Sequence, residues 1–217
     1  MSIDALIMAA GKGIRFGSYK QLSLVGESTV LALACRLFSD RVDRIIVASP
    51  PDTQPAELRM RAGLDEAVEV VEGGSLREES VLNALRAASA EYVLIHDAAR
   101  PACPWDLVDR VIKAMAETGC AVPALKPSST LKYLEDDGSL KPLDRDRVYF
   151  IQTPQGYRRK QLLEAYETRS GSGYTDSSSI ALEAGMKPAI VEGSPLNIKI
   201  TVPEDLLRIR EIIQEDE

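Results

Sequence analysis

The sequence predicts an α/β fold with one mostly parallel sheet and helices on both of its faces. Short apolar runs recur along the chain, and amphipathic segments of about 10 to 15 residues separate them. This alternation is typical of βαβ units, whose crossover helices cover both faces of a sheet. Since 217 residues are enough to bury a sizeable core, we expect a single domain over residues 1–217.

Five apolar runs in the first part of the chain are expected to be strands, and four amphipathic segments are expected to be helices. Ser28 is a candidate N-cap for the first helix, and Gly63 and Gly119 are expected to end two later ones. The strands are expected at 4–10, 44–50, 68–74, 91–97 and 120–126. The helices are expected at 30–38, 56–63, 80–88 and 104–119.

Residues 127–150 interrupt this alternation. TLKYL at 130–134 and LKPL at 140–143 flank Asp137-Gly138, a dipeptide that favours a hairpin turn. Neither run has enough apolar residues to form a layer of the core. We therefore expect a hairpin that projects as an arm and contacts a second subunit.

The remaining residues return to the α/β pattern. Helices are expected through LLEAY at 162–166 and after the polar TDSSS segment at 175–179, and a strand is expected at 187–193. A last helix is expected to start near Pro203, because proline is well tolerated in the first turn of a helix.

Composition excludes several classes of protein. The net charge of -7 argues against broad nucleic-acid binding, which needs a basic face. Three scattered cysteines form neither a disulfide framework nor a zinc motif, which favours a reducing compartment. The apolar run ALIMAA is too short for a signal peptide, and no run approaches the roughly 20 apolar residues of a membrane span. We expect a soluble, cytoplasmic protein.

The glycine-rich segment AAGKGIRFG at 9–17 is expected to hold phosphate, but it matches neither of two familiar phosphate loops. A Walker loop needs Ser or Thr after Gly-Lys, and none follows Lys12. The dinucleotide fingerprint needs G-x-G-x-x-G, whereas the glycines here read G-x-G-x-x-x-G. The strand at 44–50 also ends without the acid that would bind a ribose. A third kind of phosphate loop is therefore needed.

Candidate site residues follow the predicted strands, because ligands of open α/β sheets lie outside the carboxyl ends of the strands. Glycines and basic residues are common among them, and such groups can hold phosphate oxygens and neutralise a transferring phosphoryl group. They are Gly11, Lys12, Gly13, Arg15, Lys20, Gly73, Gly74, Ser75, Arg77, Ser80, His96, Asp97, Ala98, Ala99, Arg100, Lys126, Thr130, Asn197 and Lys199.

Most of these residues also have an ordinary structural interpretation. The glycines fit a tight turn, and the segment around Ser80 and the TDSSS segment fit helix starts. His96, the one histidine, is interpreted as a hydrogen-bonded packing residue rather than a base. Asp97 is harder to explain in this way, because an acid at the end of a buried strand costs desolvation energy unless it binds something.

The motifs taken together resemble one family. AAGKGIRFG, KQL, EGGSLREESVLNAL, HDAARP, TLK, DR, QTPQGY, TD and NIKITVPEDL occur in this order from near residue 5 to residue 207. The set resembles the 2-C-methyl-D-erythritol 4-phosphate cytidylyltransferase family of the non-mevalonate isoprenoid pathway. HDAARP, TPQ and the NIK-T-PEDL pieces are specific to that family and its close alditol-phosphate relatives. AAGxGxR alone is shared by many sugar nucleotidyltransferases.

The resemblance implies a fold, a reaction and partners. The fold would be a Rossmann-like sheet of the nucleotide-diphospho-sugar transferase type, with residues 127–150 as a projecting dimerisation arm. The chain would transfer a cytidylyl group from CTP to 2-C-methyl-D-erythritol 4-phosphate, releasing pyrophosphate. It would act as a homodimer without nucleic acid or membrane partners.

The resemblance also implies roles for particular residues. The nucleotide would be bound by Ala9, Ala10, Gly11, Gly13, Gly74, Ser75, Ser80, Asp97 and Ala98. The acceptor would be bound by Asp97, Arg100, Thr130, Arg145, Thr153 and Lys199, with Thr130 and Arg145 reaching from the arm into the neighbouring subunit's site. The catalytic residues would be Arg15, Lys20, Arg145 and Lys199.

The expected mechanism needs no base, because a phosphate monoester is already an anionic nucleophile at neutral pH. It would attack the α-phosphorus of CTP in line, and Arg15 and Lys20 would stabilise the charge that develops there. No residue is assigned as a metal ligand, and Mg²⁺ or another divalent cation is expected on the CTP phosphates.

Some positions depart from the family's usual pattern. Met8 and Tyr19 stand where proline is common, Ser129 replaces an Asp before Thr130, and Ser177 stands where an acid is common; the loop between Arg15 and Lys20 is also short. These changes leave open a cytidylyltransferase for another acceptor, such as ribitol 5-phosphate or a glycerol phosphate. A non-catalytic nucleotide-binding module on the same fold is a further alternative. A GT-A glycosyltransferase is disfavoured, because no Asp-x-Asp motif lies at a core strand end.

Overall fold

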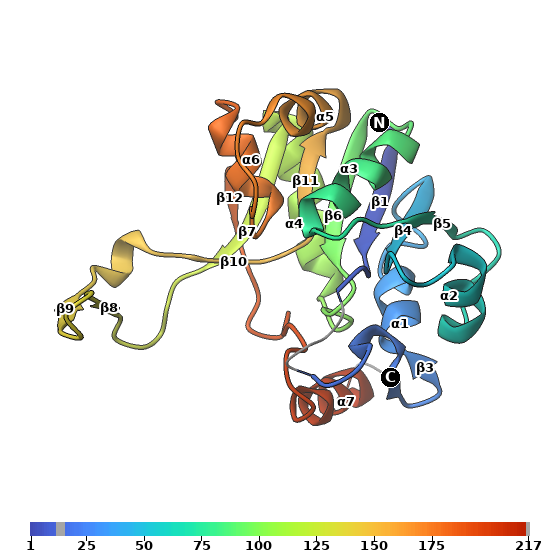
Figure 1. Ribbon diagram of the computed structural model, residues 1–217, viewed down its shortest axis with the longest axis horizontal. Coiled ribbons are helices and arrows are strands. Elements are labelled where there is room, and N and C mark those ends of the chain that lie inside the picture. Colours follow the sequence, from blue (N-terminus) through green and yellow to red (C-terminus); the bar gives the residue numbers. More distant parts are fainter. Residues whose placement is uncertain (12–15, 216–217) are drawn as a thin grey trace.

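The computed structural model describes residues 1–11 and 16–215 and shows the α/β fold that the sequence predicts (Figure 1). The main sheet has the strand order β10-β7-β11-β6-β1-β4-β5, and β12 also pairs with β7. Its strands are β1 (Ile3–Met8), β4 (Arg44–Ser49), β5 (Glu69–Glu72), β6 (Tyr92–Asp97), β7 (Cys120–Leu125), β10 (Phe150–Ile151), β11 (Gln155–Arg158) and β12 (Ala189–Glu192).

Parallel pairing dominates this sheet. β1 pairs in parallel with β4 and β6, β4 with β5, and β7 with β12. β11 lies between β6 and β7 and is antiparallel to both, so the flanking strands run in the same direction. The carboxyl ends of β1, β4, β5 and β6 therefore meet at one edge of the sheet.

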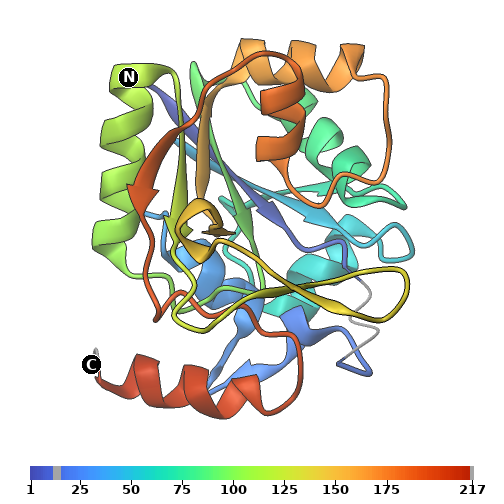
Figure 2. The same cartoon turned by 90° about the vertical axis from the view of Figure 1, so that its left-hand side faces the viewer.

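Helices cover both faces of the sheet, and alternate side chains of β1 point to opposite faces. Ile3, Ala5 and Ile7 pack in a core formed with α1, α2 and α4, whereas Leu6 and Met8 pack in a second core with α3, α5 and α6. Figure 2 shows these layers on the two sides of the sheet. The helices are α1 (Val30–Arg36), α2 (Pro55–Ala62), α3 (Arg77–Ala87), α4 (Trp105–Thr118), α5 (Arg159–Thr168) and α6 (Ser177–Glu183).

The last helix, α7 (Asp205–Glu215), lies away from the sheet and beside the small hairpin of β2 (Leu24–Val25) and β3 (Ser28–Thr29) (Figure 1). Ile209 of this helix packs with Val25 and Ile200 in a third apolar cluster. The cluster joins the carboxyl-terminal segment to the loop that follows β1.

The N-cap of the first helix lies one residue later than expected. The side chain of Thr29, not Ser28, accepts a hydrogen bond from the amide of Ala32 at 3.1 Å. Ser28 pairs in the small hairpin, and its hydroxyl accepts from the guanidinium of Arg36. The two helix-ending glycines are as predicted: Gly63 and Gly119 have φ of +63° and +87° after α2 and α4.

The predicted hairpin is present in residues 127–150. β8 (Lys132–Leu134) and β9 (Leu140–Pro142) pair in an antiparallel hairpin with Gly138 at φ +81° in the turn. Figure 1 shows the hairpin well apart from the main sheet, to which two extended segments connect it. Its apolar side chains are exposed, including Tyr133, Leu134 and Leu140.

Within the described residues, no helix combines the length and apolar character that a membrane span needs. The cytoplasmic location expected from the sequence stays a prediction.

Candidate active site

Two adjoining cavities lie at the edge where the parallel strands end. The glycine-loop cavity, about 350 Å³, lies beyond the end of β1, and the Thr153 cavity, about 520 Å³, lies beside β6 and β7. Both are lined by Arg77, Asp97 and Lys199. Two ligands bound in these cavities would therefore meet at the same three side chains.

The structure brings most of the sequence-predicted residues to these cavities. The glycine-loop cavity is lined by Ala9, Ala10, Gly11, Lys20, Gly74, Ser75, Ser80, Asp97, Ala98 and Lys199. The Thr153 cavity is lined by Asp97, Arg100, Thr153 and Lys199. Lys12, Gly13 and Arg15 lie outside the described residues, so their predicted roles stay predictions.

The buried side chain of Gln21 contacts the backbone of Ala9 and Gly11, directly after β1. Its amide nitrogen donates to the carbonyl of Ala9 at 2.8 Å and lies 3.4 Å from the carbonyl of Gly11. Lys20, the neighbouring residue, donates to the carbonyl of Ile200 at 2.7 Å. These contacts connect the loop after β1 to the segment that precedes α7.

The loop between β5 and α3 needs its two glycines. A Cβ atom on Gly73 would lie 2.1 Å from the carbonyl oxygen of Ser49, and one on Gly74 would lie 2.2 Å from the Cβ of Glu79. The amide of Gly74 donates to the hydroxyl of Ser80 at 3.0 Å. A side chain at either glycine would displace the wall of the glycine-loop cavity.

Asp97 ends β6 with its carboxylate surrounded by three cations. Oδ1 lies 3.2 Å from Nη2 of Arg77, and Oδ2 lies 2.7 Å from Nζ of Lys199 and 3.8 Å from Nε of Arg100. Burial alone would raise the pKa of Asp97, but the attraction of the three cations outweighs burial and holds this pKa well below its usual range.

The charge balance at Asp97 favours anionic ligands. One negative charge is set against three positive charges, and the carboxylate is only 11% exposed. The buried Nε of Arg100 has no hydrogen-bond partner among the residues that the structure describes. Phosphate groups in either cavity would meet this excess of positive charge in a region partly shielded from water.

Arg77 joins the two cavities, although the resemblance assigned it no role. It is the first residue of α3, and its guanidinium lies between Asp97 and the buried hydroxyl of Ser177, with 3.5 Å from Nη1 to Ser177 Oγ. The sequence signal was its position four residues after Gly73, in the loop that follows β5. Its reach to Asp97 depends on the packing of α3 against β1 and β4, next to β6, which the sequence does not show.

The TDSSS segment is both a helix start and a cavity wall. Asp176 caps α6 by accepting from the amide of Ser179 at 3.1 Å, and it accepts from the side chain of Gln155 at 2.9 Å. Thr175, Asp176, Ser178 and Ser179 line the Thr153 cavity. The expected helix start is confirmed, and the same segment borders the Thr153 cavity.

Thr130 and Arg145 are not brought to either cavity of their own chain. They belong to the segment of 127–150 that carries the hairpin, and their side chains are exposed. Their predicted reach into a neighbouring subunit stays a prediction.

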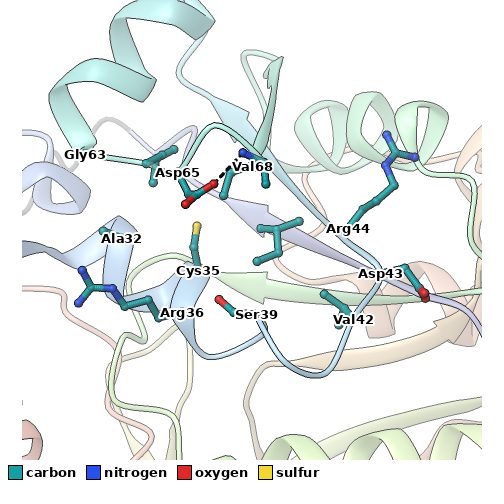
Figure 3. A pocket seen from close by; sticks show the side chains of 13 residues that line it. Ala32, Cys35, Arg36, Ser39, Val42, Asp43, Arg44, Gly63, Asp65 and Val68 are labelled. Carbon is teal, nitrogen blue, oxygen red and sulfur yellow. Dashed lines mark hydrogen bonds between the residues drawn. The ribbon is translucent and has the colours of Figure 1, made fainter.

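A third cavity, about 560 Å³, lies at the opposite edge of the sheet, where β4 begins (Figure 3). Its polar groups do not converge: Figure 3 shows the guanidinium groups of Arg36 and Arg44 on opposite sides. They bond to Ser28 and to Ser89 respectively. Burial raises the pKa of the Cys35 thiol in its floor to about 12, so this thiol is not a nucleophile at neutral pH.

The residues around Asp97 do not form a metal cage. Nowhere in residues 1–11 and 16–215 do three His, Cys, Asp or Glu side chains come together as metal ligands. Arg77 and Lys199 occupy the two carboxylate oxygens of Asp97. A divalent cation at this site would depend on phosphate oxygens of a bound nucleotide for its ligands.

A parallel sheet whose carboxyl edge holds a glycine-rich loop beside a cationic pair of cavities is the arrangement of a nucleotidyltransferase. Comparison with known proteins identifies which kind. A family model described as IspD, 2-C-methyl-D-erythritol 4-phosphate cytidylyltransferase, matches residues 3–215. The chain belongs to this family.

Relatives and solved structures agree with the family match. The 2-C-methyl-D-erythritol 4-phosphate cytidylyltransferase of Bacillus mycoides is 35% identical over 211 residues, which cover 93% of each chain. The crystal structure of the Thermus thermophilus protein of the same description is 34% identical, with a TM-score of 0.83 over 99% of this chain and 100% of that one.

Some relatives are longer than this chain. The bifunctional enzyme IspD/IspF of Anaeromyxobacter dehalogenans is 38% identical over 220 residues, which cover 98% of this chain but 57% of that protein. This chain thus spans little more than half the length of the bifunctional relatives.

Proposed function

We propose that this protein transfers the cytidylyl group of CTP to 2-C-methyl-D-erythritol 4-phosphate, giving 4-diphosphocytidyl-2-C-methyl-D-erythritol and pyrophosphate. The observation that carries the proposal is the pair of cavities sharing Arg77, Asp97 and Lys199. A reaction that joins two phosphorylated molecules needs two anion sites in contact. Membership of the family supports the choice of CTP and methylerythritol phosphate.

In the proposed reaction, CTP occupies the glycine-loop cavity and the acceptor occupies the Thr153 cavity. The acceptor phosphate attacks the α-phosphorus in line, the bond from this phosphorus to the β-phosphate oxygen breaks, and pyrophosphate leaves. Lys199 and Arg100 hold the acceptor phosphate near the shared wall, while Lys20 and Arg15 meet the α-phosphate. The protein contributes position and positive charge, and no proton has to be removed from the acceptor.

We further propose that Mg²⁺ or another divalent cation accompanies CTP, on the phosphates rather than in a protein cage. When bound there, such an ion neutralises charge on the departing pyrophosphate. The scarcity of free carboxylate oxygens around Asp97 supports this arrangement.

The hairpin arm is proposed to join two copies of the chain, with Thr130 and Arg145 completing the site of the neighbouring subunit. Its exposed Leu134 and Leu140, 63% and 64% exposed, support an apolar contact. Large exposed apolar side chains on a projecting element are typical of interaction surfaces. On this proposal residues 1–217 form one domain, and residues 127–150 are its dimerisation arm.

The proposed function is tested by pyrophosphate release from CTP and Mg²⁺ with single acceptors. Methylerythritol phosphate, ribitol 5-phosphate and glycerol phosphate are each supplied to the same folded protein. We expect release with methylerythritol phosphate to exceed the others by at least about tenfold, a difference of about 1.4 kcal/mol in transition-state binding. Preference for another acceptor would support cytidylyl transfer but contradict methylerythritol phosphate as the substrate. No release with any acceptor would favour the non-catalytic alternative.

A further inference from the structure

Thr153 lines the Thr153 cavity, and its hydroxyl contacts a buried histidine. His96 is fully buried in β6, and its ring packs edge-on against Phe38, with ring centroids 5.2 Å apart. Thr153 is 3% exposed but lines the cavity. Hydrogen bonds at these two residues therefore affect what the cavity offers a ligand.

The partners of the His96 ring determine its tautomer. Nε2 lies 3.1 Å from the carbonyl oxygen of Arg100. Because a carbonyl oxygen can only accept, Nε2 must carry a proton. Burial lowers the pKa of His96 to about 4; Asp97 and the Arg100 carbonyl oppose this shift, and the charges of Arg100 and Lys199 add to it. The ring is therefore neutral at pH 7, and Nδ1 carries a lone pair.

That lone pair determines the direction of the Thr153 hydroxyl. Thr153 Oγ1 lies 3.2 Å from Nδ1 of His96 and accepts from the amide of Asp97 at 3.1 Å. Since Nδ1 accepts, the hydroxyl proton of Thr153 must point to it. A hydroxyl has one proton and two lone pairs, so a single lone pair is left for a ligand.

We propose that His96 is a positioning residue that fixes the Thr153 hydroxyl, so that Thr153 recognises a hydroxyl of the acceptor polyol rather than a phosphate oxygen. A phosphate oxygen has no proton to share and would face a lone pair, whereas a polyol hydroxyl can donate to it. The cations Arg100 and Lys199 take the phosphate instead. The acceptor would thus lie with its polyol end at Thr153 and its phosphate at the cations.

This inference rests on the proposed function for the identity of the acceptor, but the polarity of Thr153 follows from the contacts alone. Its first test needs no activity. His96 is the one histidine in the chain, so ¹⁵N-histidine labelling yields a single ring spectrum from the full-length protein. We expect the neutral Nε2–H tautomer throughout pH 6 to 8. A neutral Nδ1–H tautomer or an imidazolium ring in that range would overturn the proposal.

The second test combines Thr153→Val with acceptors lacking one hydroxyl. The probes are the 1-deoxy, 2-deoxy and 3-deoxy forms of methylerythritol phosphate. We expect wild type to lose about tenfold in kcat/KM with one of the three, as for loss of one net hydrogen bond. Thr153→Val should lose a similar factor with the intact acceptor and no more with that analogue. Additive losses for all three analogues would overturn the proposal.

Matched variants separate positioning from packing. Thr168→Val removes an exposed threonine hydroxyl from α5 and should leave all rates unchanged. His96→Asn keeps an amide oxygen able to accept near Nδ1, whereas His96→Gln keeps a donor near Nε2 and loses that acceptor. We expect His96→Asn to retain more of the discrimination between the acceptor and its sensitive deoxy analogue. If both variants fold and discriminate alike, the positioning role is wrong.

The outcomes also separate this inference from the proposed function. Pyrophosphate release with ribitol 5-phosphate but not methylerythritol phosphate would overturn the proposed acceptor. The comparison of wild type with Thr153→Val would then use deoxy forms of ribitol 5-phosphate. Release with none of the three acceptors would overturn both the proposed function and recognition of a polyol by Thr153. The tautomer of His96 is measured in every case.

Discussion

At the scale of single residues, Asp97 gathers three positively charged side chains around its carboxylate. Its two oxygens bind Arg77 and Lys199, which line both cavities. The carboxylate keeps these side chains oriented while leaving an excess of positive charge. We therefore expect phosphate groups to bind without a rearrangement of the cations, as in a preorganised site that stabilises developing charge.

Replacing Lys199 with alanine tests this arrangement. We expect Lys199→Ala to lower kcat about 100-fold, because a charge aimed at the reacting phosphates is lost. Lys160→Ala, which removes an exposed lysine of α5, is the matched control and should leave kcat unchanged. Steady-state pyrophosphate release measures both variants. A Lys199→Ala enzyme with the wild-type kcat would contradict the role of this side chain.

His96 predicts a pH dependence of stability. Its folded-state pKa of about 4 lies below the unfolded value of 6.5, so the unfolded chain binds the proton more readily. The stabilisation is complete above pH 6.5 and is lost as pH falls toward 4. Between pH 7.5 and pH 5 the free energy of unfolding should fall by about 2 kcal/mol from this residue.

Urea unfolding at the two pH values measures this loss, and His96→Gln provides the comparison. The variant should show a loss smaller than that of wild type by about 2 kcal/mol, whatever its absolute stability. Asp97 does not confuse the result, because its depressed pKa affects stability only below the usual pKa range of aspartate. Equal losses in both proteins would contradict a buried neutral histidine.

At the scale of elements, the loops that follow the strands carry the residues of the site. The loop after β5 is positioned by close contact between Gly73 and the backbone of Ser49. Gly73 donates its amide to the carbonyl of Ser49 at 3.0 Å and leaves no room for a Cβ. This contact ties the loop after β5 to the end of β4. The glycine pair thus has a packing reason in addition to its predicted role in binding nucleotide.

Gly73→Ala should lower the free energy of unfolding by about 3 kcal/mol and weaken CTP binding, because Ser49 and the loop must move apart. Gly185→Ala, at φ +79° with no atom within 4 Å of the added Cβ, should cost only about 1 kcal/mol of backbone strain and leave CTP binding intact. Urea unfolding and CTP titration distinguish the two variants. Equal effects of the two substitutions on stability and CTP binding would contradict a special need for glycine at residue 73.

Elements with local signals were the ones that the sequence could predict. Gly63 and Gly119 end helices where left-handed residues are needed, and Asp137-Gly138 marks the hairpin. β11 was not predicted, because QGYR has no clear apolar alternation and its place between β6 and β7 depends on long-range pairing. The cap of α1 is Thr29 rather than Ser28, since the hydroxyl of Thr29 accepts from the amide of Ala32, whereas that of Ser28 accepts from the guanidinium of Arg36.

The same division applies to the site. Residues at strand ends or in the loops that follow, such as Asp97 and Gly74, could be found from the order of strands and loops alone. The roles of Arg77 and Gln21 as connecting side chains could not, because their partners come from segments distant in sequence or from backbone carbonyls. A local pattern of residue types does not show which distant segments come into contact in the folded chain.

At the scale of the whole molecule, the position of the arm raises the question whether each site is formed by one chain or by two. Thr130 and Arg145 lie on a segment that leaves the sheet, and neither lines the cavities of its own chain. If the site is shared, a dimer holds two sites, each with a core from one copy and an arm from the other.

Mixing two inactive variants tests this sharing. Lys199→Ala removes a core residue and Arg145→Ala removes an arm residue, so a hybrid dimer contains one intact site. After subunit exchange at equal amounts, activity should recover to about a quarter of wild type, since half of the dimers are hybrids with one good site of two. Exchange confirmed by mass spectrometry without any recovery would contradict a shared site.

The central claim is cytidylyl transfer to methylerythritol phosphate, and a competition experiment tests it most directly. One reaction contains limiting CTP, Mg²⁺ and equal amounts of methylerythritol phosphate, ribitol 5-phosphate and glycerol phosphate, and the products are identified by mass spectrometry. We predict that 4-diphosphocytidyl-2-C-methyl-D-erythritol is the main product. A different cytidylyl product, or CTP left unchanged by folded protein, would contradict the claim.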